Sequence, residues 1–174
     1  ALAGRLAPGG AAEAAPPRAP VLFVVGSRAA RTRRQLAVLA ERLPGLAVGE
    51  TAAEPDEGAR AVALVPPRDE AGRDPDAVAA ALADEARRLM ARLAPGLVVA
   101  TGGDTALALL DRLGAGTIEV LGEPWPGVVR SRLGPDGATL VTKAGGFGAE
   151  TLFADVAAWA GLLPGGRVEG CPLV

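Results

Sequence analysis

Residues 101–105 combine residue types that suit the binding of a phosphate group. An apolar run ends there, two glycines follow, and an acidic and a hydroxyl residue precede an amphipathic stretch, 106–113, that stops at Gly114. This order is typical of a strand, a tight turn and the start of a helix. Glycine lets a ligand approach the backbone closely, and the first N–H groups of a helix attract anions. The candidate binding residues are Gly102, Gly103, Asp104 and Thr105.

The same segment has a purely structural interpretation. Asp104 or Thr105 could be the N-cap of the helix, and the glycines would then only form a turn. Asp104 has a further role open to it, because a carboxylate at this place can bind Mg²⁺ or the waters of Mg²⁺. Short glycine motifs match by chance, so this segment alone leaves the interpretations open.

Two further glycine turns repeat the design. Gly26 and Ser27 follow the apolar run 21–25, and the glycine-rich segment 144–148 follows Lys143. Because the carboxyl ends of parallel strands lie along one edge of a sheet, we expect all three turns to meet there. Three such turns in one chain favour a phosphate-bearing ligand. The additional candidate binding residues are Ser27, Lys143, Gly145 and Gly146.

Basic residues lie next to two of these turns. Four arginines crowd the start of a helix that we predict from about residue 29 to 43, where the helix dipole disfavours cations. A bound anion would account for them, and so would a solvated helix face. Lys143 could likewise reach a phosphate or only cap an exposed strand end. The arginines are Arg28, Arg31, Arg33 and Arg34.

The elements that position the turns follow from periodicity and from Gly and Pro breaks. They predict an α/β fold with an open, mostly parallel, mixed sheet flanked by helices. A late β-hairpin turns at residues 134–137, and Trp125 and Trp159 are packing residues. The predicted strands are 21–25, 46–48, 61–65, 97–101, 117–120, 127–132 and 139–143. The predicted helices are 29–43, 75–93, 106–113 and one over 152–159.

Length and composition indicate one globular domain. The chain has 174 residues, of which 49% are hydrophobic and 22% charged, and this excludes a disordered chain. Residues 1–20 are rich in Ala, Pro and Gly and are expected to be a linker or the tail of an upstream domain. The domain proper is then 21–174. Since the chain starts at Ala1, we expect it to be part of a longer protein.

Several function classes are excluded by what the sequence lacks. It has no histidine and no tyrosine, so imidazole metal sites and Ser-His or Cys-His catalysis cannot be built within this chain. A lone Cys171 fits a reducing, cytoplasmic compartment. A net charge of −2 argues against a nucleic-acid or anionic-membrane surface. The apolar runs are too short to span a membrane.

Two common phosphate-binding motifs are also absent. A P-loop needs a Gly-Lys-Ser/Thr ending, and a Rossmann fingerprint needs Gly-x-Gly-x-x-Gly after the first strand, where residues 26–31 read Gly-Ser-Arg-Ala-Ala-Arg. Residues 102–105 are similar to the Gly-Gly-Asp-Gly turn of phosphofructokinase-like, lipid and NAD kinases, without its last glycine.

Four segments in order resemble the C-terminal, nucleotide-binding domain of the four-carbon acid sugar kinase family. They are 24–27 followed by Thr32 and Gln35, then 101–106, 126–128 and 143–148, and the resemblance covers about residues 20–160. Members of that family phosphorylate four-carbon sugar acids such as erythronate, threonate or their oxo derivatives with ATP. Their N-terminal domain carries an Asp-Asp-x-Thr-Gly signature and binds the sugar acid, and the nucleotide lies between the domains. That signature does not occur in this sequence, so the sugar-acid-binding domain is absent from this chain.

The resemblance implies ATP and Mg²⁺ as cofactors. By position it implies that Ser27, the turn 102–105 and Gly145 contact ATP, with Gly146 and Lys143 nearby. The catalytic base stays unknown and would come from the missing domain, so we expect the isolated chain to bind ATP or ADP weakly and to have no kinase activity. No nucleic-acid or membrane partner is expected, and a homo-oligomer is left open.

One departure from the family pattern supports an alternative. The family usually has a second serine two residues after the first, and this chain has Ala29 there. A non-catalytic ligand-binding or regulatory α/β domain that has lost productive ATP contacts is therefore the competing hypothesis. An oxidoreductase domain, testable by NAD titration, ranks third.

Overall fold

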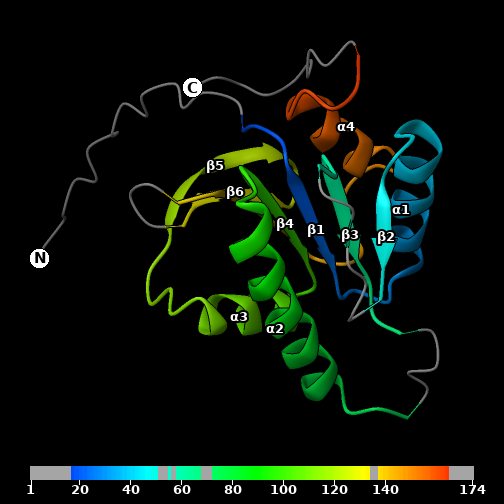
Figure 1. The fold of residues 1–174 in the computed structure, drawn as a ribbon. Helices are drawn as coiled ribbons and strands as arrows, with labels where there is room; N and C mark the ends of the chain where they lie inside the picture. The colour runs from blue at the N-terminus through cyan, green and yellow to red at the C-terminus, as the bar shows by residue number, and fades with distance from the viewer. Residues whose placement is uncertain (1–16, 51–54, 56–57, 68–71, 134–136, 165–174) are drawn as a thin grey trace, which may run out of the picture.

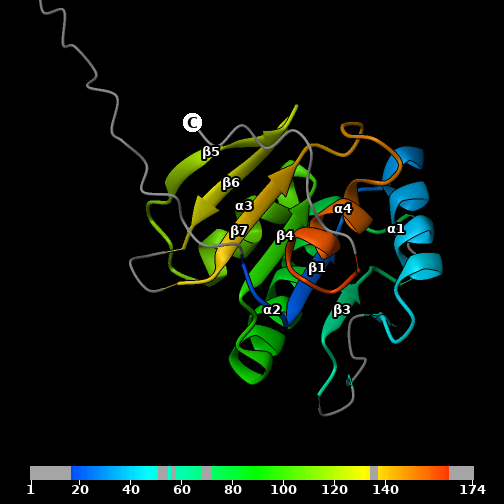
Figure 2. The same cartoon turned by 90° about the horizontal axis from the view of Figure 1, so that it is seen from above.

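Seven strands form one mixed sheet in the order β2-β3-β1-β4-β7-β6-β5 (Figure 1, with β7 labelled in Figure 2). The computed structural model describes residues 17–50, 55, 58–67, 72–133 and 137–164. The strands are β1 (Val21–Val25), β2 (Ala47–Gly49), β3 (Ala61–Leu64), β4 (Leu97–Thr101), β5 (Glu119–Trp125), β6 (Val128–Arg132) and β7 (Thr139–Lys143). The helices are α1 (Ala30–Arg42), α2 (Pro75–Leu93), α3 (Gly103–Arg112) and α4 (Leu152–Trp159).

The first five strands of that order pair in parallel, whereas β6 pairs antiparallel with β7 and β5 pairs antiparallel with β6. Every residue of β1 and β4 is buried, because helices cover both faces of the parallel part. The side chains alternate between two cores, so that Phe23 lies in one and its neighbour Leu22 in the other. The prediction of a mostly parallel sheet with a late hairpin, now β6–β7, is confirmed.

The helices lie in two pairs on opposite sides of the sheet. α1 contacts α4, and α2 contacts α3 (Figure 2). On the first side the ring of Phe23 packs against Phe153, with 5.4 Å between the ring centroids. On the other side Leu82 and Leu109 pack over β1 and β4. Along the described part of the chain, no helix is both long enough and apolar enough to cross a membrane.

The chain order creates a switch point between β1 and β4. After β1 the chain passes through α1 to strands on one side of β1, and α2 then carries it back to β4 on the other side. The helices that follow these two neighbouring strands, α1 and α3, therefore lie on opposite faces. In open α/β sheets such a point leaves a crevice at the carboxyl ends of the strands, and ligands bind there.

One strand prediction is wrong. The strand predicted at 117–120 instead covers 119–125, and it pairs with β6 through two register shifts. β5 is an edge strand, where Gly122, Pro124 and irregular pairing are tolerated. Cys171, turn residues 134–136 and residues 1–16 of the expected linker lie outside the described residues.

Candidate functional site

The three glycine turns meet at the carboxyl edge of the sheet, as the sequence predicts. The backbone N–H of Ser27, after β1, donates to Thr101 Oγ1 at the end of β4, at 3.4 Å. The N–H of Gly102 donates to the carbonyl of Lys143, at the end of β7, at 3.1 Å. These contacts join strands that are neighbours in the sheet, so the turns form one continuous surface. Nucleotide contact by these residues stays a prediction.

Two of the glycines are required by close packing between the turns. A Cβ at Gly26 would overlap the hydroxyl of Thr105, in the first turn of α3. A Cβ at Gly145 would overlap the hydroxyl of Ser27. Gly103 and Gly146 differ, because a Cβ at either would meet no described atom within 4 Å. The first pair holds the turns together, and the second pair leaves backbone open to an incoming group.

The start of α3 differs from the predicted one. The helix begins at Gly103 and its N-cap is Gly102, so neither Asp104 nor Thr105 is the cap and the predicted start at 106 is wrong. Gly102 adopts φ 94°, a conformation that glycine reaches without strain, and glycine has no side chain that could cap the helix. No side chain among the described residues caps the first N–H groups, which suits them to bind an anion.

The two polar side chains in the first turn of α3 differ in exposure, because one is buried and the other faces solvent. Thr105 is 4% exposed and packs against Gly26. Asp104 is exposed and borders a cleft of about 260 Å³. No group of three or more metal-ligating side chains occurs in the described part of the chain. The cleft is lined by Gly26, Ser27, Arg28, Pro75, Val78, Ala79, Gly102, Asp104 and Thr105.

A buried network around Thr32 connects the β1 and β7 turns. The Thr32 hydroxyl can donate to the carbonyl of Gly145 at 2.8 Å or to Ser27 Oγ at 3.2 Å. Lys143 is 4% exposed, and its ammonium donates to Thr32 Oγ1 at 3.2 Å and to the carbonyls of Ala144 and Gly145 at 3.1 Å each. Burial lowers the pKa of Lys143 to about 8. The network fixes the Gly145 carbonyl, so Lys143 organises the turn from inside.

The sequence pointed to Thr32 and Gln35 as parts of a family pattern, and neither was among the predicted site residues. Gln35 is fully buried, and its Nε2 donates to the carbonyl of Phe147 at 3.0 Å and to that of Ala149 at 2.8 Å. Both residues are polar, lie on α1 and hold the loop after β7. The signal that could have identified them is a polar residue on the otherwise apolar face of a predicted helix, because a polar group buried there needs a hydrogen-bond partner.

The four arginines divide into different roles. Arg31 and Arg34 pair with Glu150, at 3.9 and 3.2 Å, and Arg33 donates to the carbonyl of Arg28. Of the four, only Arg28 lines the cleft in the described structure. The solvated-face interpretation therefore fits three of them, which are exposed, and the anion interpretation is left with Arg28.

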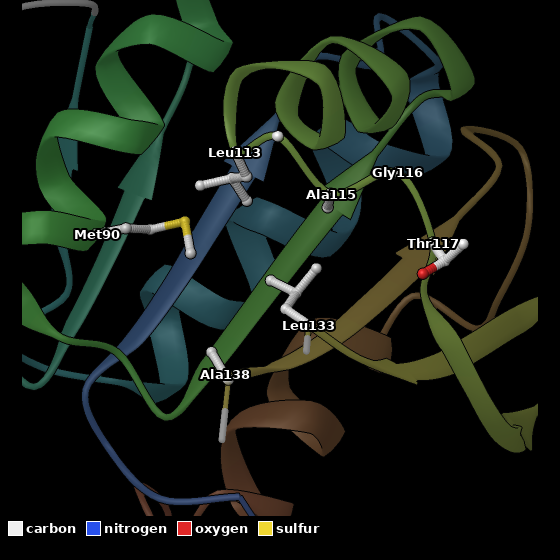
Figure 3. Close-up of a pocket in the computed structure, with 9 residues that line it drawn as sticks. Met90, Leu113, Ala115, Gly116, Thr117, Leu133 and Ala138 are labelled. Carbon is white, nitrogen blue, oxygen red and sulfur yellow. The ribbon is translucent and has the colours of Figure 1, made fainter. Parts of the chain in front are cut away.

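A larger cavity, of about 470 Å³, lies at the opposite edge of the sheet (Figure 3). It opens between the ends of α2 and α3 and the chain that enters β7, and apolar side chains from several elements point toward it. It has no charged side chain among its described lining residues. These are Met90, Leu113, Gly114, Ala115, Gly116, Thr117, Leu133, Gly137 and Ala138.

Comparison with known proteins gives the family. Residues 45–153 match the model of a family described as a nucleotide-binding C-terminal domain. No curated protein matched the sequence. A domain of unknown function from Bordetella bronchiseptica, solved with bound citrate as a domain-swapped dimer, is 32% identical over 84% of this chain and 42% of its own, with a TM-score of 0.71. A second crystal form of it gives 34% identity, 88% and 41% coverage and a TM-score of 0.67.

A Haemophilus influenzae protein assigned to the same domain of unknown function is 20% identical over 81% of this chain and 39% of its own, with a TM-score of 0.54. At this level of identity the likeness shows the fold. The chain thus spans about two fifths of the solved chains it matches. The match to the domain model covers more than half of the residues and includes the central glycine turn. The chain therefore belongs to the four-carbon acid sugar kinase family, as its nucleotide-binding C-terminal domain.

Proposed function

We propose that this domain holds ATP for a kinase that phosphorylates four-carbon sugar acids of the erythronate, threonate or oxo-tetronate class. The convergence of three glycine turns at the switch point carries the proposal. Phosphoryl transfer depends mainly on positioning and on stabilising negative charge. Backbone N–H groups at the start of α3 can supply both without a catalytic side chain.

The residues present fit a magnesium ion that arrives with the nucleotide. Mg²⁺ is commonly held by one or two carboxylates together with substrate phosphates. Asp104 provides one carboxylate at the cleft, beside the uncapped start of α3. Arg28 lines the cleft, and the ammonium of Lys143, buried behind the β7 turn, adds a second positive charge to this edge of the sheet. The ion would neutralise phosphate charge, and the protein would orient the chain of phosphates.

The sugar acid and the base that activates its hydroxyl belong to the upstream domain in this proposal. The isolated chain then binds ATP or ADP weakly and transfers no phosphate. The full-length kinase of this proposal works in the cytoplasm. Titration calorimetry of the isolated chain with ATP and ADP, with and without Mg²⁺, tests the first part. Absence of binding under all four conditions contradicts it.

A coupled assay with erythronate, threonate and their oxo derivatives tests the second part. We expect turnover of one of these acids by the full-length protein and none by the isolated chain. Ala29 favours the alternative of a non-catalytic regulatory domain, because it removes a hydroxyl from the β1 turn, and its Cβ faces Gly145. A full-length protein that binds ATP and phosphorylates none of the acids would support that alternative.

A further inference from the structure

The 260 Å³ cleft has two unlike walls. One wall is polar and comes from the β1 turn and the start of α3, with Ser27, Arg28 and Asp104. The other wall is the first part of α2, with Pro75, Val78 and Ala79. These three residues are spaced i, i+3 and i+4, so they form one continuous apolar strip on the helix surface. The cleft therefore offers one end to charge and the other to apolar surface.

The two helix starts at the cleft also differ in charge. α3 has no side-chain cap and begins with glycines. At α2 the carboxylate of Asp74 accepts from the N–H of Asp76 at 3.3 Å, Pro75 has no N–H to offer, and Asp76 adds a second acidic group. An anion is favoured at the start of α3 and disfavoured at the start of α2, so a phosphate chain cannot occupy both ends.

We infer that the first turn of α2 is the nucleoside subsite, with the base and ribose of a nucleoside triphosphate lying on Val78, Pro75 and Ala79. This inference rests on the proposed nucleotide function. Val78 is half-buried and Ala79 is 6% exposed, so the strip is held in place by the core beneath it. The cleft is smaller than a typical pocket for a whole ligand, which fits a site that takes one part of the nucleotide.

Phe147 is the rival position for the base. Phe147 is 55% exposed at the same edge of the sheet, and its ring packs on Gly127. It belongs to the loop held by Gln35 on the α1 side and does not line the cleft. The α2 strip shares a cleft with the uncapped start of α3 and Phe147 does not, so the strip is the better placed of the two.

The test compares ATP with tripolyphosphate, which carries the phosphates without the nucleoside, by titration calorimetry in Mg²⁺. In the unmodified chain ATP binds more tightly than tripolyphosphate. Val78→Gln raises the Kd for ATP about tenfold and changes that for tripolyphosphate less than twofold, because only apolar contact is lost. Retained tripolyphosphate binding also shows that the variant is folded. Val120→Gln, on the edge strand β5, is the matched control and changes neither Kd.

Each result decides the inference. Equal affinity of the unmodified chain for the two ligands, or unchanged ATP affinity in Val78→Gln, overturns the nucleoside subsite and leaves the proposed phosphate site intact. If Phe147→Ala binds ATP no more tightly than tripolyphosphate while Val78→Gln still prefers ATP, the base lies on the loop after β7 and not on α2. If Val78→Gln loses both ligands, the smaller Val78→Ala decides by whether ATP alone weakens, about threefold. Failure of both ligands to bind the unmodified chain contradicts the proposed function itself.

Discussion

The two edges of the sheet carry hollows of opposite character. The amino edge has the larger one, about 470 Å³ and lined mainly by apolar side chains and glycines. The carboxyl edge has the smaller one, about 260 Å³, with an uncapped helix start, an arginine and a carboxylate. The direction of the parallel strands accounts for this difference, because every helix after a parallel strand begins at the carboxyl edge. The proposed site for a charged ligand therefore lies at the smaller of these two hollows.

The largest expected difference between the two edges is tested by substituting one glycine at each edge. Gly103 and Gly116 both have open space where a Cβ would lie, and neither has a positive φ. Gly103→Leu is expected to weaken ATP binding about a hundredfold, because the side chain occupies the phosphate position. The free energy of unfolding should stay the same or rise by up to about 1 kcal/mol, since leucine favours helix over glycine.

Gly116→Leu is the control and should leave the Kd for ATP unchanged. Calorimetry for binding and thermal unfolding for stability measure both variants. A stability loss in Gly103→Leu that accounts for its binding loss would mean that the turn is only structural.

Thr32→Val tests the network behind the carboxyl edge. It keeps the shape of the side chain and removes the hydroxyl that bonds the Gly145 carbonyl and the Lys143 ammonium. Unfolding free energy should fall by about 1–3 kcal/mol, because buried polar groups lose a partner. The Kd for ATP should rise about fivefold as the β7 turn loosens. Thr32→Ser keeps the hydroxyl and should retain most of the binding, whereas an unchanged Kd in Thr32→Val would show that the hydroxyl does not support the binding of ATP.

The pKa of Lys143 gives a pH test of the same edge. Burial lowers this pKa to about 8 from an ordinary 10.5. A bound polyphosphate favours the charged ammonium, so ATP affinity should be highest below pH 8 and fall by a few-fold as the pH rises through 8. Lys143→Met should flatten this dependence. A wild-type affinity that is constant from pH 7 to 9 would show that the ammonium does not act on the ligand.

Folding stability should change with pH in the opposite sense. Between pH 8 and 10.5 the unfolded chain binds more protons at Lys143 than the folded chain does, so this residue makes the protein more stable as the pH rises. Denaturant titrations at several pH values measure the slope.

The smallest effect is expected at the amino edge. Ala115→Leu adds apolar volume to the larger cavity (Figure 3) and should raise the free energy of unfolding by about 0.5–1 kcal/mol. Thermal unfolding would then move up by about 2–4 °C. The Kd for ATP should not change, and a change of more than about twofold would mean that the two edges are coupled.

Local patterns predicted the sheet, both helix layers and the meeting of the three turns, because each depends on periodicity and on strand direction. What failed depends on distant partners. The crowding of arginines on α1 suggested an anion, yet Arg34 pairs with Glu150, 116 residues away. The N-cap of α3 was misassigned because the helix begins three residues earlier than predicted, at Gly103, which puts Gly102 at the cap position. Lys143 was expected at a strand end or a phosphate, and the burial that turns it toward Thr32 has no local signal.

The long sequence separations within the site have a consequence for folding. The strands β5, β6 and β7 form consecutive hairpins, whose contacts close short loops. The contacts that join the glycine turns link residues 74 apart, Ser27 with Thr101, and 113 apart, Thr32 with Gly145. Such contacts form late because closing a long loop costs more entropy. During synthesis the proposed nucleotide site cannot form until the segment around Gly145 has emerged from the ribosome and docked, so nucleotide should stabilise the completed domain and no earlier intermediate.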